Sequence, residues 1–421
     1  MRVRTGLRVS SAKWAAPVAV ALSLLYYYGS GVGSQSFGYS PSIVSSALGT
    51  LYAAAYALTA ALAVWESGRL KAAGVWAMAP VRSRYRVAWN GVAPVVFCGW
   101  ILLLLPVAIA LGSARAVPTP ASTAPLAMAM ILCVAHAVVG FAVGLLVPRT
   151  VAAPVVAAVI WVLVAFSWST DAFWVRHVSG QYPTSLMFGE LATYGSFVPH
   201  LLFAGGIAAG IALLWVPLRP KVVRAALALA VMVGCPALAY QEVKSWGPNP
   251  PVLLGQAPMN CAGESPKVCL PQASPARATA VRKEAASVLD DLRSAGFPGS
   301  PRVIIDRLGD GRYPPPSSQD TWRVGLTDAV RRGDLRYELT RASVQFPCLR
   351  VDPFRGNSVM LWAATVTGEE ATYNAHMKMR DEPFRREAEV RGAVRRILAA
   401  GPAEQGDWYR RNIAAGCRQS S

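Results

Sequence analysis

The pattern of hydrophobic positions divides the chain near residue 240. Before that point long apolar runs alternate with short polar or basic connections, and after it apolar positions occur in short amphipathic stretches. A helix needs about 20 apolar residues to cross the hydrocarbon core of a bilayer. The runs of suitable length are residues 14–32, 43–65, 91–112, 125–147, 151–168, 198–217 and 222–240. The pattern predicts an all-α polytopic membrane bundle of about seven transmembrane helices in residues 1–240.

The first run follows the basic stretch of residues 1–13, and a basic start before an apolar core is also typical of a cleaved signal peptide. The run is long for a signal peptide, and no small-residue cleavage site follows it directly. We therefore expect an uncleaved membrane helix, with a signal peptide as the alternative.

The remainder of the chain predicts a small α+β domain. Residues 241–275 are rich in proline and are expected to form an extended linker, and residues 276–421 form the domain itself. Residues 276–297 place their apolar side chains on one helical face, which predicts an amphipathic helix. Further helices are expected at residues 382–400 and 407–415, and strands at residues 302–308 and 358–367, the second of them buried.

The distribution of charged residues supports the same division. The 421 residues are 53% hydrophobic and carry a net charge of +18, which on its own suggests nucleic-acid binding. However, only three acidic residues, Glu66, Asp171 and Glu190, precede residue 240, whereas 15 basic residues do, so 12 of the 18 excess charges (15 minus 3) belong to the apolar part. The charge therefore indicates membrane topology, and we expect no nucleic-acid partner.

The basic residues also predict orientation. If the N-terminus is cytoplasmic and the sides alternate, the inner connections hold 13 lysines and arginines, and the outer short loops hold Arg115 and Arg176. Basic residues accumulate on the cytoplasmic side of membrane proteins. With seven spans in the cell membrane, the C-terminal domain is then extracytoplasmic.

Four cysteines lie in the C-terminal part, Cys261, Cys269, Cys348 and Cys417. An oxidising compartment permits two disulfides. Cys261 with Cys269 would close a small loop, and Cys348 with Cys417 would tie the end of the domain to its middle. Three pairings are possible and the sequence does not choose between them; four unpaired thiols are the alternative.

Residues 65–89 are the only charged, helix-patterned segment between two long apolar runs. Glu66 stands at its start, Arg69 and Lys71 follow, and Leu70 and Trp76 share the interval with them. An acidic start and basic end suit the dipole of a helix, and the mixture predicts an amphipathic helix at the membrane surface that ends at Pro80. A basic loop held by anionic lipid is the alternative.

Glu66, Gly74, Pro80 and Arg82 in this segment resemble the coupling loop of type-2 ABC permeases, the membrane half of ABC exporters. The resemblance covers roughly residues 1–220. It implies a short cytoplasmic helix that fits a groove on an ATP-hydrolysing subunit, and short re-entrant helices in residues 169–197. It assigns the coupling role to Glu66, Arg69, Gly74, Trp76, Pro80 and Arg82.

The chain departs from this family after residue 220, because the usual six-span permease ends in the cytoplasm. The C-terminal pattern resembles the cysteine-bearing outer domains of actinobacterial permease-like proteins of undefined role.

Motifs for chemistry are missing from the sequence. It holds no G-x-x-x-x-G-K-[ST], and its C-terminal domain has no H-E-x-x-H, G-x-S-x-G or S-x-x-K in a supporting context. His376 is the only histidine of that domain, so a zinc site with two histidines cannot form there. We expect no enzyme, cofactor or metal. His136 falls within the fourth run, where an ionisable group often lines a pathway; a neutral histidine bonded to a neighbouring helix is the alternative.

These observations lead us to expect the permease subunit of an ABC-type exporter, embedded in the lipid bilayer and served by a separate ATP-binding cassette ATPase. It would pair with a second copy or a related permease. The sequence does not reveal the cargo. The alternative is a non-transport membrane protein that anchors an extracytoplasmic sensing or binding domain.

Overall fold

The structure is a computed structural model, and it describes residues 10–29, 38–49, 51–78, 83–217, 219–272, 274–348, 350–379 and 386–417. The chain forms two compact units, Met1–Leu254 and Gly255–Ser421. We call them the membrane unit and the outer unit. The boundary between them falls inside the stretch that the sequence predicts to be a linker.

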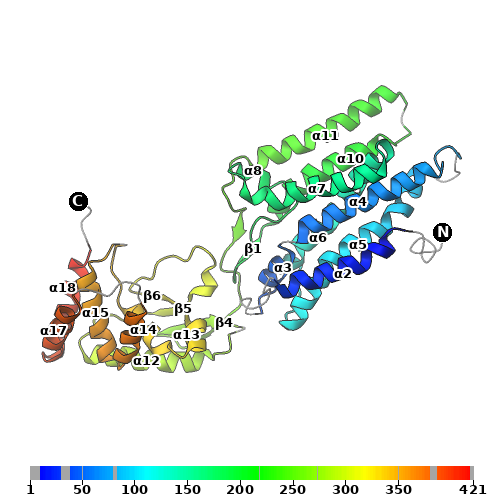
Figure 1. Ribbon diagram of the computed structural model, residues 1–421. Helices are drawn as coiled ribbons and strands as arrows, with labels where there is room; N and C mark the ends of the chain where they lie inside the picture. The colour runs from blue at the N-terminus through cyan, green and yellow to red at the C-terminus, as the bar shows by residue number, and fades with distance from the viewer. Residues whose placement is uncertain are drawn as a thin grey trace. The chain divides into compact units, whose positions relative to one another are not determined.

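The membrane unit is a bundle of long helices (Figure 1). Its main helices are α2 (Ala12–Gly29), α3 (Ser40–Leu48), α4 (Leu51–Ala72), α5 (Arg84–Ser113), α6 (Pro120–Leu146), α7 (Arg149–Ala165), α10 (Gly206–Leu213) and α11 (Lys221–Val243). Local sequence explains where some of them begin. Thr119 accepts a hydrogen bond from the backbone N–H of Ser122, whose hydroxyl accepts one from the N–H of Thr119, and Pro120 fits the first helical turn of α6.

Five helical stretches are long and apolar enough to cross a membrane, and a sixth is if α3 and α4, which are bent by 51° at their junction, count as one span. The five are Arg84–Ser113, Pro120–Leu146, Arg149–Ser169, Tyr194–Leu213 and Lys221–Val243. The first run of the sequence corresponds to α2, whose 18 residues are not among these spans. A helical membrane unit is therefore confirmed, and the count of seven spans stays a prediction.

Helix α4 lies at the centre of the membrane unit, and small residues let α6 approach it closely. A Cβ atom at Gly140 of α6 would lie 2.9 Å from the Cα atom of Ala60, and one at Gly144 would lie 2.9 Å from the Cα atom of Val64. Small residues at such positions are how membrane helices gain close backbone contact. The side chains of Tyr52 and Tyr56 in the N-terminal half of α4 are fully buried.

Residues 169–197 hold only short helical elements and irregular backbone. The segment holds α8 (Phe173–Arg176), a short strand β1 (Leu191–Ala192) that pairs with β2 (Val252–Leu253), and a 3-10 turn at Tyr194–Phe197. Buried polar groups hold the irregular backbone in place, because Arg176 donates to the carbonyls of Trp168 and Thr170. The short re-entrant helices that the resemblance implies for this segment stay a prediction.

The outer unit is an α/β arrangement built on a four-stranded sheet in the order β3-β4-β5-β6. Strand β3 (Met259–Ala262) is antiparallel to β4 (Lys267–Pro271), while β4, β5 (Val303–Asp306) and β6 (Thr321–Val324) are parallel. Parallel strands need a crossover connection, and α12 (Ala278–Ser294) supplies it between β4 and β5. The remaining helices are α13 (Leu326–Arg332), α14 (Leu335–Ser343), α15 (Pro353–Val366), α16 (Glu370–Lys378), α17 (Glu387–Leu398) and α18 (Pro402–Ala415).

Several expectations for this unit are confirmed and two are wrong. Helices α12, α17 and α18 and strand β5 lie where the pattern places them. Residues 241–275 are not a linker throughout, because α11 runs to Val243 and the second half of the stretch supplies β3 and β4 of the sheet. Residues 358–367 are not a strand but part of α15, which begins where Asp352 accepts a hydrogen bond of 3.0 Å from the N–H of Arg355. Burial on several sides of α15 removes the amphipathic pattern that would have identified a helix.

Candidate functional site

Glu66 lies near the end of α4 and is fully buried. Its Oε1 atom accepts hydrogen bonds from the backbone N–H and the hydroxyl of Ser11, at 2.7 and 2.8 Å. Its Oε2 atom lies 2.6 Å from Nη2 of Arg69. Because Ser11 immediately precedes α2, the carboxylate caps the positive end of that helix. Glu66 therefore joins α2 to the end of α4.

The separate surface helix that the sequence predicts after Glu66 is not found among the described residues. Instead α4 continues through good helix formers to Ala72, turns follow as far as Met78, and α5 begins at Arg84. The chain turns at Gly74, whose φ of +63° favours glycine. Pro80 and Arg82 lie outside the described residues. We call residues 73–78 the basal turn.

The basal turn is exposed but anchored. Met78 is 67% exposed, and Ala73, Gly74 and Ala77 are exposed with it. The ring of Trp76, in contrast, packs edge-on against Phe141 of α6 and Trp215, with centroid distances of 6.4 and 5.7 Å. One aromatic side chain thus connects an accessible surface to the interior of the membrane unit.

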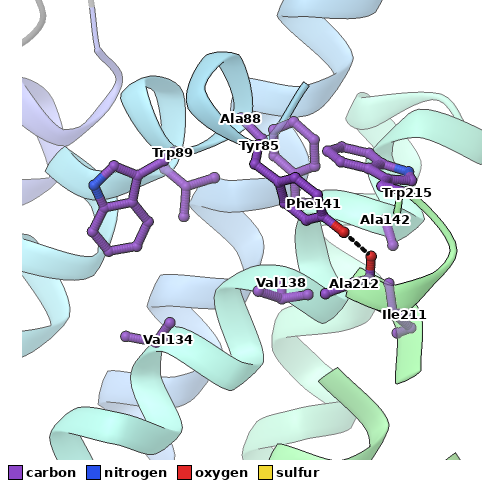
Figure 2. Close-up of a pocket in the computed structure, with 11 residues that line it drawn as sticks. Tyr85, Ala88, Trp89, Val134, Val138, Phe141, Ala142, Ile211, Ala212 and Trp215 are labelled. Atoms are coloured by element: carbon purple, nitrogen blue, oxygen red, sulfur yellow. Dashed lines mark hydrogen bonds between the residues drawn. The ribbon is translucent and has the colours of Figure 1, made fainter. Parts of the chain in front are cut away.

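The same two aromatic residues line a cavity of about 300 Å³ between α5, α6 and the end of α10 (Figure 2). Tyr85 and Trp89 come from α5, Val138 and Phe141 from α6, and Ala212 and Trp215 from α10 and the turn after it. The Tyr85 hydroxyl donates to the carbonyl of Ala212 at 2.5 Å, which ties the start of α5 to the end of α10. The lining is aromatic and aliphatic, so the cavity suits an apolar group.

Sequence reasoning missed this cavity. Its walls come from three elements far apart in the chain, and each lining residue on its own resembles an ordinary apolar membrane residue. The weak signal in the sequence is the pair of aromatic residues Tyr85 and Trp89 at the end of the charged segment 65–89.

His136 lies on α6, away from this lining. Its Nδ1 atom is 2.8 Å from the carbonyl oxygen of Leu132 in the same helix, and its ring stacks on Tyr56 at a centroid distance of 4.6 Å. These contacts agree with a packed histidine that is hydrogen-bonded within its own helix. A role for His136 in a pathway stays a prediction.

A polar layer near Gly180 was not predicted from the sequence. The Gly180 carbonyl accepts a hydrogen bond from the Tyr56 hydroxyl at 2.7 Å, and its N–H donates to Nδ1 of His200 at 3.1 Å. His177, whose Nε2 is 2.8 Å from the carbonyl oxygen of Gly247, is buried beside it, and burial lowers the pKa of His177. These bonds fasten the loop after α8 to α4, which is a structural role.

Asp306 is a fully buried carboxylate of the outer unit and lies at the carboxyl end of β5. It accepts hydrogen bonds from the N–H and hydroxyl of Thr327, at 2.7 and 2.6 Å, and from the N–H of Leu308 at 3.0 Å. Burial raises the pKa of Asp306 in spite of these bonds. The carboxyl ends of parallel strands are where α/β folds bind ligands, but here the carboxylate is engaged by its own chain and positions the start of α13.

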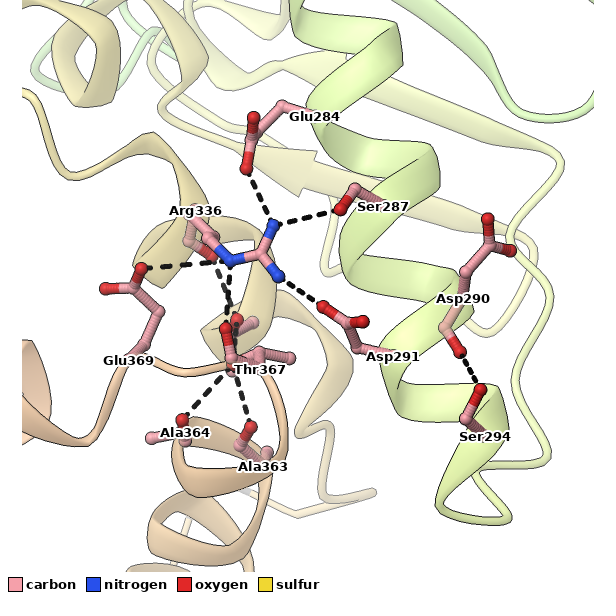
Figure 3. A network of polar contacts seen from close by, with 11 residues as sticks. Glu284, Ser287, Asp290, Asp291, Ser294, Arg336, Ala363, Ala364, Thr367 and Glu369 are labelled. Atoms are coloured by element: carbon pink, nitrogen blue, oxygen red, sulfur yellow. Dashed lines mark hydrogen bonds and ion pairs between the residues drawn. The ribbon is translucent and has the colours of Figure 1, made fainter.

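Arg336 of α14 is the centre of a polar network in the outer unit (Figure 3). Its Nη1 atom donates to Glu284 at 2.8 Å and Nη2 to Asp291, both on α12, while Nε donates to the carbonyl of Thr367 at 2.9 Å. Burial alone would lower the pKa of Arg336, but the bond to Glu284 and the charges of Asp291 and Glu284 raise it. The network joins α12, α14 and the turn after α15.

The cysteines of the outer unit form two disulfides. Cys261 and Cys269 face each other across β3 and β4, and Cys348 is joined to Cys417 after α18. Of the three pairings that the sequence leaves open, this is the one in which Cys261 and Cys269 close a small loop and Cys348 and Cys417 tie the end of the domain to its middle. Within the described ranges, no group of three or more His, Cys, Asp or Glu side chains is arranged to hold a metal ion.

Comparison with known proteins bears on the outer unit. Residues 268–417 match the model of a family described as a domain of unknown function, DUF7224. The match runs from β4 to Cys417, the residue that closes the second disulfide. No curated protein and no solved structure matches the chain.

Proposed function

We propose that this chain is the membrane permease subunit of an ABC-type exporter and works with a separate ATP-hydrolysing subunit. The observation that carries the proposal is the double contact of Trp76, which belongs to the exposed basal turn and packs on Phe141 and Trp215 of the apolar cavity. An ATPase that pushes on the basal turn would displace Trp76. The cavity walls would then have to move, since packed aromatic side chains leave no free space between them.

The buried Glu66 supports this proposal mechanically. It fastens α2 to the end of α4 through Ser11, and Arg69 neutralises its remaining charge. The two hydrogen bonds from Ser11 to the buried carboxylate hold the start of α2 against the end of α4, so we expect the two helices to move together. A force on the basal turn, which directly follows α4, therefore acts on a rigid pair of helices rather than on a flexible tail.

The proposal places the basal turn in the cytoplasm and the outer unit outside the cell membrane. Cationic side chains gather near the basal turn: Lys71 precedes it, Arg84 and Arg86 follow it, and Arg149 stacks on Trp65 at 4.8 Å. Two disulfides in the outer unit suit an oxidising compartment. In reduced intact cells a membrane-impermeant thiol reagent should label these cysteines; labelling only after lysis would reverse the orientation.

Helices α7 and α11 leave broad apolar surfaces uncovered within the membrane unit. Only 22% of the apolar window of the α7 span and 11% of that of α11 is buried. Lipid covers such surfaces, or a second permease does. We propose a homodimer or a heterodimer with a related permease, which would enclose a pathway between the two chains.

Affinity purification of the full chain tests the proposal. A Walker A peptide identified by mass spectrometry in the purified complex would reveal the ATPase subunit. Met78→Asp puts a charge on the most exposed apolar residue of the basal turn and should lower recovery of the ATPase. Trp76→Ala should leave association intact but weaken coupling between transport substrate and ATP hydrolysis. Trp14→Ala, at a residue 76% exposed on α2, is the matched control.

The proposal fails if no ATPase accompanies the chain, or if Met78→Asp and Trp76→Ala both behave as Trp14→Ala does. Glu66→Gln and Arg82→Ala should also weaken coupling, and intact coupling in both variants would contradict the role given to this segment.

A non-transport protein that anchors an external sensing or binding domain is the second candidate. The family match favours it, because it covers the outer unit and leaves the membrane unit unmatched. Deletion of residues 255–421 separates the two candidates. An anchor loses its role with that deletion, whereas a permease retains its assembly with the ATPase.

A further inference from the structure

The cavity between α5, α6 and α10 has a cation at its edge. Arg224, in the first turn of α11, donates from Nη1 to the carbonyl of Val216 at 3.2 Å, and Val216 directly follows Trp215 of the cavity wall. Arg224 therefore stands where an apolar space meets the basic end of the membrane unit.

Two buried hydrogen-bond donors near this edge have no partner within the described part of the chain. They are Nε of Arg224 and the indole Nε1 of Trp76, and the Trp76 ring lies 5.7 Å from that of Trp215. Buried donors nearly always find an acceptor, so each unsatisfied one calls for an explanation. Arg224, which is bonded to the carbonyl next to Trp215, is the residue placed to meet an acceptor-rich group at this edge.

The surroundings favour an anionic group in that position. Arg84 and Arg86 are exposed in the first turn of α5, and Lys221 begins α11. Glu66 is the one acidic residue before Asp171 in the sequence, and it is already paired with Arg69. The region thus offers uncompensated positive charge next to aromatic walls, which is the chemistry that recognises the headgroup region of an anionic lipid.

The cavity volume limits the apolar part of the ligand. About 300 Å³ holds roughly ten groups of the size of a water molecule or a methylene. That is a segment of one acyl chain, not a whole lipid. The helices that form the cavity, α5, α6 and the span that contains α10, are long and apolar enough to cross a bilayer, so lipid is the surrounding solvent.

We propose that this cavity binds one acyl chain of an anionic phospholipid from the surrounding bilayer, with the phosphate held by Arg224. Because Phe141 and Trp215 contact both the cavity and Trp76, the bound chain supports the packing of the basal turn. The site requires a membrane but no transport. Its test is therefore independent of whether an ATPase partner exists.

Native mass spectrometry of the full chain in detergent tests this site. The protein is titrated with phosphatidylglycerol and, separately, with phosphatidylcholine of the same acyl chains. Choline cancels the phosphate charge of phosphatidylcholine, whereas phosphatidylglycerol keeps a net negative charge. Wild-type protein should therefore retain phosphatidylglycerol about fivefold better, which is the effect of one basic residue near an anionic headgroup. Arg224→Gln should abolish this preference, Arg224→Lys should keep most of it, and Arg115→Gln, at an exposed cation elsewhere, should leave it unchanged.

A second pair of variants tests the acyl-chain pocket. Val138→Phe fills the cavity and should reduce retention of both lipids, whereas Val159→Phe, at a position 50% exposed on α7, should not. Ala142→Leu fills the same space with a smaller group and replaces Val138→Phe if that variant aggregates. Equal retention of the two lipids by the wild type, an Arg224→Gln variant that matches Arg115→Gln, or a filled cavity that retains lipid normally would each overturn the proposal.

Discussion

Removing the disulfide between Cys348 and Cys417 should destabilise the outer unit more than removing the one between Cys261 and Cys269. A disulfide restricts the unfolded chain, and the restriction grows with the length of the loop that it closes. The two sequence separations are 69 and 8 residues. The loop-entropy relation then gives about 4 kcal/mol for the long loop and about 2.5 kcal/mol for the short one.

The free energy of unfolding of residues 255–421 can be measured by urea denaturation, because this unit has its own core around Val288, Leu289 and Trp362. With a urea m-value of about 2 kcal/mol per molar, the Cys348→Ser/Cys417→Ser variant should lose about 2 M in midpoint. The Cys261→Ser/Cys269→Ser variant should lose about 1.2 M under the same assumption. Alanine in place of serine at each pair controls for the polarity of the new side chain.

An equal loss for the two pairs would refute the reasoning, and so would a loss under about 1 kcal/mol for the long loop. Either result would mean that other contacts already order the end of the chain. The bridge between Val351 and Cys417 and the hydrogen bond of 2.7 Å from the N–H of Asp352 to the carbonyl of Gly416 are the contacts that could do so.

Three further predictions concern single residues. Arg336→Met should lower the free energy of unfolding of the outer unit, measured in urea, by about 1–3 kcal/mol, because two carboxylates and a carbonyl lose their donor. Arg302→Met breaks only an exposed ion pair and should cost under about 1 kcal/mol. Burial raises the pKa of Asp306, so the folded unit binds a proton at this carboxylate more readily than the unfolded chain does. The free energy of unfolding should therefore fall as the pH rises from about 4 through the raised pKa. Asp306→Asn should flatten this part of the pH profile. Gly140→Val should lower the thermal unfolding midpoint of the full chain because a side chain there meets the backbone of Ala60, while Gly112→Ala, with open space around it, should not.

The sequence predicted most reliably the elements that carry one strong physical signal. Helix α12 shows its apolar face at every turn, and Val281, Val288 and Leu292 are indeed buried. The long apolar runs of α5 and α6 became helices of 30 and 27 residues because lipid leaves an isolated chain no other way to satisfy its backbone.

Two predictions were wrong for different physical reasons. Helix α15 is buried on several sides, and its Val359, Trp362 and Ala363 therefore give no period that distinguishes a buried helix from a buried strand. The prediction of a separate helix after Glu66 was wrong for another reason. Its charges suggested a new helix with Glu66 at the start, but Ser11, far away in the sequence, binds the carboxylate and lets α4 run on.

The candidate site was harder to predict than the helices and strands, because it depends on contacts between residues of different elements. Trp76 was identified from the coupling-loop resemblance, yet only the structure places it against Trp215. The cysteines were identified as disulfide candidates, but three pairings were equally open until the strands brought Cys261 opposite Cys269. Sequence spacing determines neighbours within one element, whereas contacts between elements depend on the whole packing.

The packing also indicates which part of the membrane unit can move if the basal turn is pushed. Helices α4 and α6 cannot separate without losing the close backbone contact at Gly140. Helices α10 and α11 form a second pair, because a Cβ atom at Gly210 of α10 would lie 2.7 Å from the carbonyl oxygen of Ala228. Just before α10 the chain forms a π-helical turn at Leu201–Gly205, a rare element that is frequent at functional sites.

A displacement of Trp76 toward Trp215 therefore meets the rigid pair of α4 and α6 on one side. On the other side it meets the pair of α10 and α11, and α10 is preceded by the π-helical turn. Because the Trp215 end of α10 is joined to α5 by the bond between Tyr85 and Ala212, that bond must break or α5 must follow. Since the cavity lies between these same elements, its volume changes in either case, and an acyl chain that fills it would oppose the movement. The proposed lipid site and the proposed coupling turn thus act on one set of contacts, and a lipid-filled cavity should make the basal turn harder to displace.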